Sequence, residues 1–140
     1  MSSGNWSELE RDVVIVACAI SAGIHAALVP DHFDESSAAG GGFLAATVLL
    51  AGVVVVLTRL PASLVANAAA GALLAGLLAG YALATTTGLP LLHPEPESID
   101  GLALVTKVIE VLGLVAALHL IGHGRPVGAS SLIHTKGAQT

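Results

Sequence analysis

The segment IDGLALVTKVIEVLGLVAALHLI (residues 99–121) decides the fold class, because it is long enough to cross a bilayer and carries charge only at Asp100, Lys107 and Glu110. A transmembrane helix needs about 20 mainly apolar residues. Three further apolar stretches of similar length precede it, at residues 13–29, 43–60 and 63–86. The sequence therefore predicts an all-α fold, an integral membrane four-helix bundle.

The composition agrees with this class. The 140-residue chain is 54% hydrophobic and only 11% charged, and its mean hydropathy is +0.85, whereas a soluble domain carries about 25% charged residues. The net charge is −5 with five Lys and Arg residues, which excludes a basic surface for nucleic acid. No nucleophile–base arrangement, P-loop or dinucleotide motif occurs, so the sequence gives no support for catalysis of the kind found in soluble enzymes, and a non-enzymatic role is favoured. Residues 1–140 are predicted to form a single transmembrane domain, with a polar tail at 122–140.

Proline and glycine mark the predicted ends of the spans. Pro30 follows the first span, Pro61 follows the second, and Gly88 and Pro90 follow the third. Because proline removes a backbone donor and clashes with the preceding turn, we expect the first helix to stop at Pro30.

The charges predict an orientation. The connections at residues 30–42 and 88–98 carry acidic residues and neither Lys nor Arg, while the bases fall on the other side of four alternating spans, at Arg11, Arg59, Arg125 and Lys136. Positive residues remain on the cytoplasmic side. The chain is therefore predicted to be a multi-pass protein of the cell membrane, with both termini cytoplasmic.

This topology gathers histidines and carboxylates at the predicted outer face. The candidate metal ligands there are His25, His32, His93, Asp31, Glu95 and Glu97. Imidazole and carboxylate together suit a divalent transition metal such as zinc, copper(II), iron or nickel. The alternative is an acidic, solvated exterior whose prolines stiffen the connections.

Two further polar features lie within the spans. Lys107 and Glu110 are three residues apart on one helical face, so each can partly neutralise the other. His25 lies about one turn inside the first span, and a polar path from His25 to this pair is allowed by their depths. The alternatives are a structural ion pair and a neutral histidine capped by a backbone carbonyl or by Ser21.

Heme b held by this chain is disfavoured. His25 lies near the outer end of its span, whereas His119 lies roughly 30 Å from the outer end of its own, so the two rings cannot ligate one iron.

Small residues recur every four positions in the third span, including Ala72, Gly76 and Gly80. Gly76 and Gly80 form a GxxxG pattern, which is typical of close helix packing in membranes. The partner is either another helix of this bundle or a second copy of the chain. The pattern is therefore compatible with a homo-oligomer or a larger membrane complex.

The run HAALVPDHF (residues 25–33), with Asn67, TGLP (87–90) and PEPE (94–97), resembles small four-helix membrane proteins of high-GC bacteria over about residues 20–115. The resemblance implies a bacterial inner-membrane topology and draws attention to His25 and His32. It implies no activity.

Three functions are compatible with these patterns. The first is a non-enzymatic membrane protein that binds a metal ion or small ligand through the outer His and carboxylate cluster. The second is a structural or accessory subunit of a larger membrane complex. The third is a small proton-coupled transporter in which Glu110 carries protons.

Overall fold

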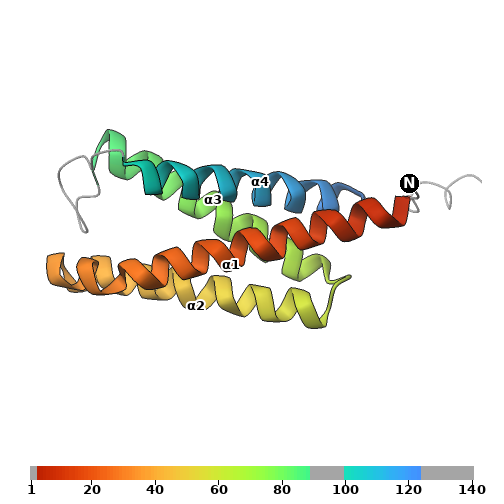
Figure 1. Ribbon diagram of the computed structural model, residues 1–140, viewed down its shortest axis with the longest axis horizontal. Coiled ribbons are helices and arrows are strands. Elements are labelled where there is room, and N and C mark those ends of the chain that lie inside the picture. Colours follow the sequence, from red (N-terminus) through yellow and green to blue (C-terminus); the bar gives the residue numbers. More distant parts are fainter. Residues whose placement is uncertain (1–2, 89–99, 124–140) are drawn as a thin grey trace, which may run out of the picture.

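The computed structural model describes residues 3–88 and 100–123, which form four helices and no strand (Figure 1). The helices are α1 (Ser3–Glu35), α2 (Ser37–Arg59), α3 (Leu64–Thr86) and α4 (Gly101–His123). Each is long and apolar enough to cross a membrane. The 23 residues of α2, α3 and α4 span about 34 Å each at 1.5 Å per residue, which exceeds a hydrocarbon core of about 30 Å. The all-α four-helix prediction is confirmed.

The first helix does not stop at Pro30, so that prediction was wrong. α1 runs on to Glu35 with Pro30 inside it, and α2 begins at Ser37 rather than at residue 43. The predicted connection at residues 30–42 is thus almost entirely helical. The single residue Ser36 separates the two helices, and its hydroxyl caps α2 by accepting from the backbone N–H of Ala39 at 3.0 Å.

Tertiary contacts with α2 explain why α1 continues past its proline. The ring of His32 stacks on Phe43 with centroids 3.6 Å apart. Phe33 covers Gly40, where a Cβ atom would overlap the phenyl ring. Because Gly40 has no side chain, α2 can approach the last turns of α1 closely. These contacts offset the backbone hydrogen bond lost at Pro30.

The other helix ends follow local capping rules. The hydroxyl of Ser63 accepts from the N–H of Ala66 at 3.2 Å at the start of α3. The carboxylate of Asp100 accepts from the N–H of Ala103 at 2.7 Å at the start of α4. After α3, Gly88 has a φ of 69°, a conformation that glycine adopts without strain.

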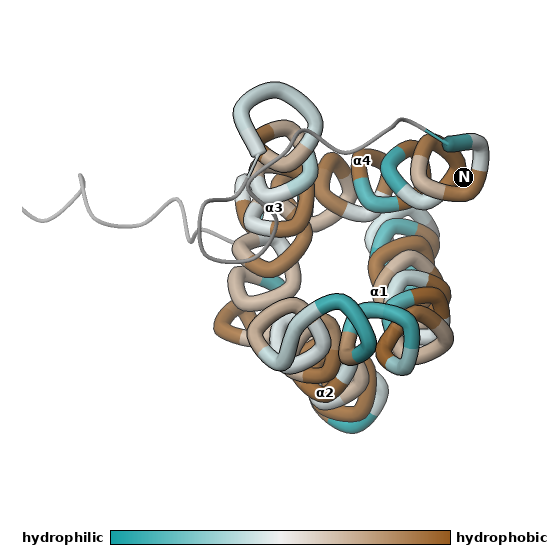
Figure 2. The backbone as a smooth tube through the Cα atoms, turned by 90° about the vertical axis from the view of Figure 1, so that its left-hand side faces the viewer, coloured by the Kyte–Doolittle hydropathy of each residue, from teal (hydrophilic) through white to brown (hydrophobic). Residues whose placement is uncertain are grey.

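The helices surround the bundle axis in chain order (Figure 2). The surface is rich in large apolar side chains, such as Val48, Val65 and Leu118. The interior holds small residues, the fully buried leucines Leu50, Leu57 and Leu74, and several polar side chains, which are Ser21, His25, Asn67, Thr106 and Glu110. An apolar exterior around a partly polar interior suits a protein whose solvent is lipid.

Close packing uses small residues of α4. A Cβ atom on Gly113 would lie 2.6 Å from Cβ of Ala17, so α1 and α4 approach each other here. A Cβ on Gly71 would lie 3.7 Å from Cβ of Ala117, which joins α3 to α4. The fold thus places its closest helix contacts at glycines other than those of the predicted GxxxG pattern.

The small residues predicted to form the packing face of α3 do not lie at these close contacts. Ala72 and Gly76 are exposed and Gly80 is half-buried, and a Cβ atom added at either glycine would meet nothing within 4 Å. The two glycines of the predicted pattern therefore make no close contact with another helix of this chain.

Candidate functional site

A hydrogen-bonded chain of polar groups links α1 to α4 inside the bundle. The Ser21 hydroxyl donates to Glu110 Oε1 at 2.7 Å, and Lys107 Nζ donates to Glu110 Oε2 at 2.6 Å. On α1, Nδ1 of His25 donates to the backbone carbonyl of Ser21 at 2.8 Å. The structure thus joins the three residues of the predicted polar path, with Ser21 as the connecting group.

Glu110 is the most deeply placed charge among the described residues. Its side chain is 0% exposed and that of Lys107 is 16% exposed. An isolated carboxylate in such a place is costly, and a partner cation with further hydrogen bonds reduces that cost. Lys107 Nζ also lies 5.2 Å from the centre of the Tyr81 ring, a cation–π contact.

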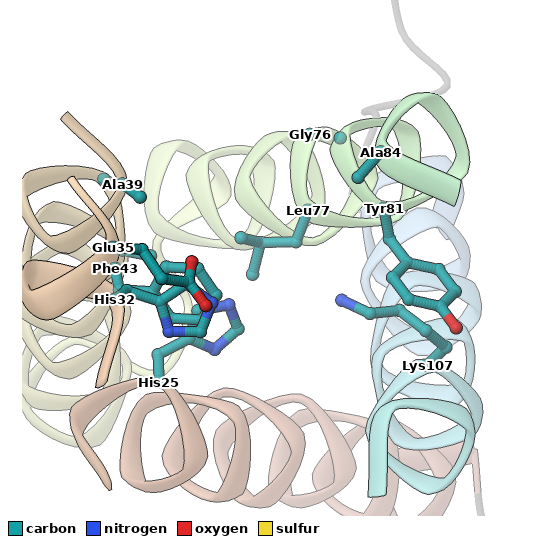
Figure 3. Close-up of a pocket in the computed structure, with 13 residues that line it drawn as sticks. His25, His32, Glu35, Ala39, Phe43, Gly76, Leu77, Tyr81, Ala84 and Lys107 are labelled. Carbon is teal, nitrogen blue, oxygen red and sulfur yellow. The ribbon is translucent and has the colours of Figure 1, made fainter. Parts of the chain in front are cut away.

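A cavity of about 200 Å³ lies beside this chain, toward the predicted outer end, and is called here the bundle cavity. Figure 3 shows His25, His32 and Glu35 on one side and Lys107 with Tyr81 on the other, with Leu77 between them. All four helices contribute to its wall, whose residues are His25, His32, Glu35, Ala39, Gly42, Phe43, Ala46, Gly76, Leu77, Gly80, Tyr81, Ala84 and Lys107.

The two imidazoles of the cavity have defined protonation sites. Nδ1 of His25 faces the carbonyl of Ser21, and Nδ1 of His32 faces the carbonyl of Leu28 at 2.9 Å. A carbonyl oxygen only accepts, so Nδ1 carries the hydrogen in each ring. In the neutral rings, Nε2 then holds a lone pair. Each ring can therefore accept a hydrogen bond or ligate a metal through Nε2.

The structure brings together only part of the predicted metal cluster. His25 and His32 share the cavity, whereas Asp31 is exposed and does not line it. His93, Glu95 and Glu97 lie outside the described residues. Within residues 3–88 and 100–123, no group of three or more His, Cys, Asp or Glu side chains is placed to hold a metal ion.

The sequence interpretation missed several groups of the site. Glu35 and Phe43 enter the cavity because α1 continues past Pro30 and α2 begins early. Tyr81 enters it from α3, and its buried hydroxyl has no hydrogen-bond partner in the described part of the chain. The bond from Ser21 to Glu110 had a usable signal, since the depth scale that compares His25 with Lys107 also places Ser21 close to Glu110.

The structure also shows where the two histidines lie that were considered as heme ligands. His25 lies in the bundle cavity, whereas Nδ1 of His119 lies 2.6 Å from Glu10 Oε1, near the first turns of α1.

Comparison of the chain with protein-family models, with curated proteins and with solved structures finds no match. The resemblance to four-helix proteins of high-GC bacteria stays a prediction, and the function is argued from the chemistry of the site.

Proposed function

We propose that this protein binds a small, neutral, lipid-soluble molecule in the bundle cavity, and that the polar end of this ligand carries hydroxyl or carbonyl oxygens. One observation carries the proposal: two imidazole acceptors and one ammonium donor line the same cavity between the helices (Figure 3). A few convergent polar groups in an otherwise apolar pocket are typical of small-molecule sites.

The hydrogen-bonding pattern supports a ligand with both a donor and an acceptor. Nε2 of His25 and His32 can accept from a hydroxyl, because Nδ1 of each ring already donates to a carbonyl. Lys107 donates one hydrogen to Glu110 and can donate another to a ligand oxygen. The aromatic rings of Phe43 and Tyr81 suit the flat, apolar part of such a molecule.

The charge balance favours a neutral ligand. Lys107 and Glu110 form a close ion pair, so together they add no net charge to the interior. A charged ligand would lose its hydration without a free counter-ion in this pair, and the other carboxylate of the wall, Glu35, is exposed at the end of α1 rather than buried in the bundle. A neutral phenol or quinol avoids that cost, and its hydroxyl supplies the donor that the two imidazoles require.

The rim of the cavity supports access from the bilayer. Gly42 of α2 and Gly76 of α3 are both exposed and both line the cavity, so the cavity reaches the surface between these helices. Gly42 is five residues from the start of α2 and Gly76 ten residues from the end of α3, or about 7 Å and 15 Å along the helices. Gly76 lies within the apolar stretch of residues 63–86 and Gly42 borders that of residues 43–60, so we infer that the ligand enters sideways from lipid.

The proposal is tested by titrating the purified chain in nanodiscs with a decyl-substituted benzoquinone and its quinol, using calorimetry. We expect saturable binding of the quinol that weakens in His32→Leu, because one Nε2 acceptor for its hydroxyl is lost. The quinone has no hydroxyl and can accept only from Lys107, so its binding should respond little to His32→Leu. Gly76→Leu should slow or weaken binding by filling the rim. Gly52→Leu is the matched control, since Gly52 is also exposed, has nothing within 4 Å of its Cβ position and lies outside the cavity wall. Binding that is equal in all four proteins would reject the cavity as the site.

The alternative ligand of this site, a divalent transition metal, is tested separately. Metal analysis of the protein after reloading with a divalent transition metal, compared between wild type and the His25→Ala/His32→Ala variant, would detect a stoichiometric metal at the outer cluster. Loss of that metal in the variant would favour a metal over an organic ligand. Absence of metal from both would remove this form of the hypothesis.

A second candidate, proton-coupled transport, is favoured by the buried chain of Ser21, Glu110 and Lys107. Buried carboxylates within membrane spans occur in the proton relays of transporters. In this function Glu110 would exchange a proton with the cavity, and the ion pair with Lys107 would form and break during transport.

A further inference from the structure

Two histidines lie one helical turn apart at the end of the bundle opposite the bundle cavity. His119 and His123 are four residues apart on α4, so they lie on the same face. Their ring centroids are 3.9 Å apart, and the rings are tilted by 43°. Two histidines at this spacing on a helix can bind one metal ion through both rings, as they do in zinc-dependent enzymes.

The second nitrogen of each ring is already held in the way that suits a metal ligand. Nδ1 of His119 lies 2.6 Å from Glu10 Oε1 of α1, and Nδ1 of His123 donates to the backbone carbonyl of His119 at 2.9 Å. In the neutral rings this leaves the lone pairs on Nε2. Metal-binding histidines typically donate their other N–H to a carboxylate or a carbonyl in this manner, which fixes the ring orientation.

The surroundings give an ion room and polar contacts. Both histidines line a cavity of about 720 Å³ together with Glu10 and Asn67. Arg11 also lines this cavity, and its positive charge is paired with Asp12 at 3.2 Å. The side chain of His119 is 52% exposed, so an ion can reach it from water. Asn67 is buried, and its Oδ1 has no hydrogen-bond partner among the residues that the structure describes. A buried acceptor of this kind is suited to a hydrogen bond from a metal-bound water.

We propose that His119 and His123 bind a divalent transition metal through their Nε2 atoms, with Glu10 as a positioning residue for His119. Since the described residues contain no group of three metal-ligating side chains, water completes the coordination. Copper(II) and nickel(II) suit such a site best, because nitrogen ligands with water in a tetragonal arrangement are typical of these ions. The site is independent of the ligand proposed for the bundle cavity.

The test is a titration of the full chain with copper(II) chloride. The protein is purified in detergent with an affinity tag that contains no histidine, and it is stripped with a chelator beforehand. Calorimetry should show one copper ion bound per chain, and electron paramagnetic resonance should show hyperfine splitting from two imidazole nitrogens. His119→Ala and His123→Ala should each weaken binding by about 10-fold or more, and Glu10→Gln by roughly 10- to 100-fold.

The matched control for Glu10→Gln is Asp34→Asn, which removes an exposed carboxylate of the same helix that does not line this cavity. Asp34→Asn should leave the affinity unchanged. The proposal is overturned if the two-nitrogen signal persists in the His119→Ala/His123→Ala variant, or if it is lost only in His25→Ala/His32→Ala. It is also overturned if wild type binds no stoichiometric copper, a result that does not depend on the folding of any variant.

Discussion

Removing the cation of the buried ion pair should strongly destabilise the bundle. In Lys107→Met, Glu110 loses a hydrogen bond of 2.6 Å and keeps only the Ser21 hydroxyl at 2.7 Å, while its side chain stays 0% exposed. Breaking a buried pair and leaving one charge uncompensated costs about 3–5 kcal/mol. This corresponds to a change of roughly two to four orders of magnitude in the unfolding equilibrium constant.

Replacing the carboxylate, Glu110, should destabilise the bundle less than replacing Lys107. In Glu110→Gln, the amide oxygen can still accept from Ser21, and Lys107, already 16% exposed, can extend its ammonium into the bundle cavity. The double variant Lys107→Met/Glu110→Gln carries no buried charge here. Its loss of stability should therefore stay below about 2 kcal/mol, the cost of an imperfectly paired polar group.

The assay is the free energy of unfolding in mixed micelles, followed by helical circular dichroism. Arg59→Met is the matched control, since Arg59 is an exposed cation at the end of α2, and its loss should change stability by less than about 1 kcal/mol. Equal stability of Lys107→Met and Arg59→Met would refute the reasoning. A double variant as unstable as the sum of its two single variants would refute it too.

Three further predictions concern packing, transport and assembly. Gly113→Leu should lower the thermal stability in detergent, because a Cβ there already lies 2.6 Å from Cβ of Ala17, whereas Gly52→Leu should not; equal melting temperatures would contradict the close approach of α1 and α4. Glu110→Gln should abolish pH-dependent flux into liposomes if the chain is a transporter, and unchanged flux would remove Glu110 from the mechanism. If the chain is a subunit of a larger complex, fixed partner chains should co-purify with wild type and be lost in Ala72→Leu, since Ala72 is exposed on α3 and does not line the bundle cavity. A monodisperse single species would count against this function.

The predicted spans and the end of the first helix show which features of the fold can be predicted from the sequence. Each span is detectable because lipid requires about 20 consecutive apolar residues, and this requirement is local. The helical limits near Pro30 were not predictable, since the stacking of His32 on Phe43 and the cover of Phe33 over Gly40 join two different helices. A proline rule describes one helix and contains no information about its neighbour.

The small residues of α3 and α4 also separate what the sequence predicts from what the packing of the helices decides. Many glycines and alanines follow a four-residue spacing in this chain, and any such ridge can pack against a helix in lipid. Only the arrangement of the bundle places Gly113 against Ala17 and leaves Gly76 at the rim of the cavity. The choice depends on the rotation of each helix about its own axis, which the spacing does not specify.

By itself, therefore, the sequence determined a four-helix membrane fold and the few polar residues that chemistry can use, because hydrophobic length and the cost of charge in lipid are local properties. The tertiary structure decided which of these residues meet. It joined Ser21 to Glu110, placed His25 and His32 across a cavity from Lys107, and paired Glu10 with His119. These contacts connect residues far apart in the chain, and their geometry exists only once the helices have packed.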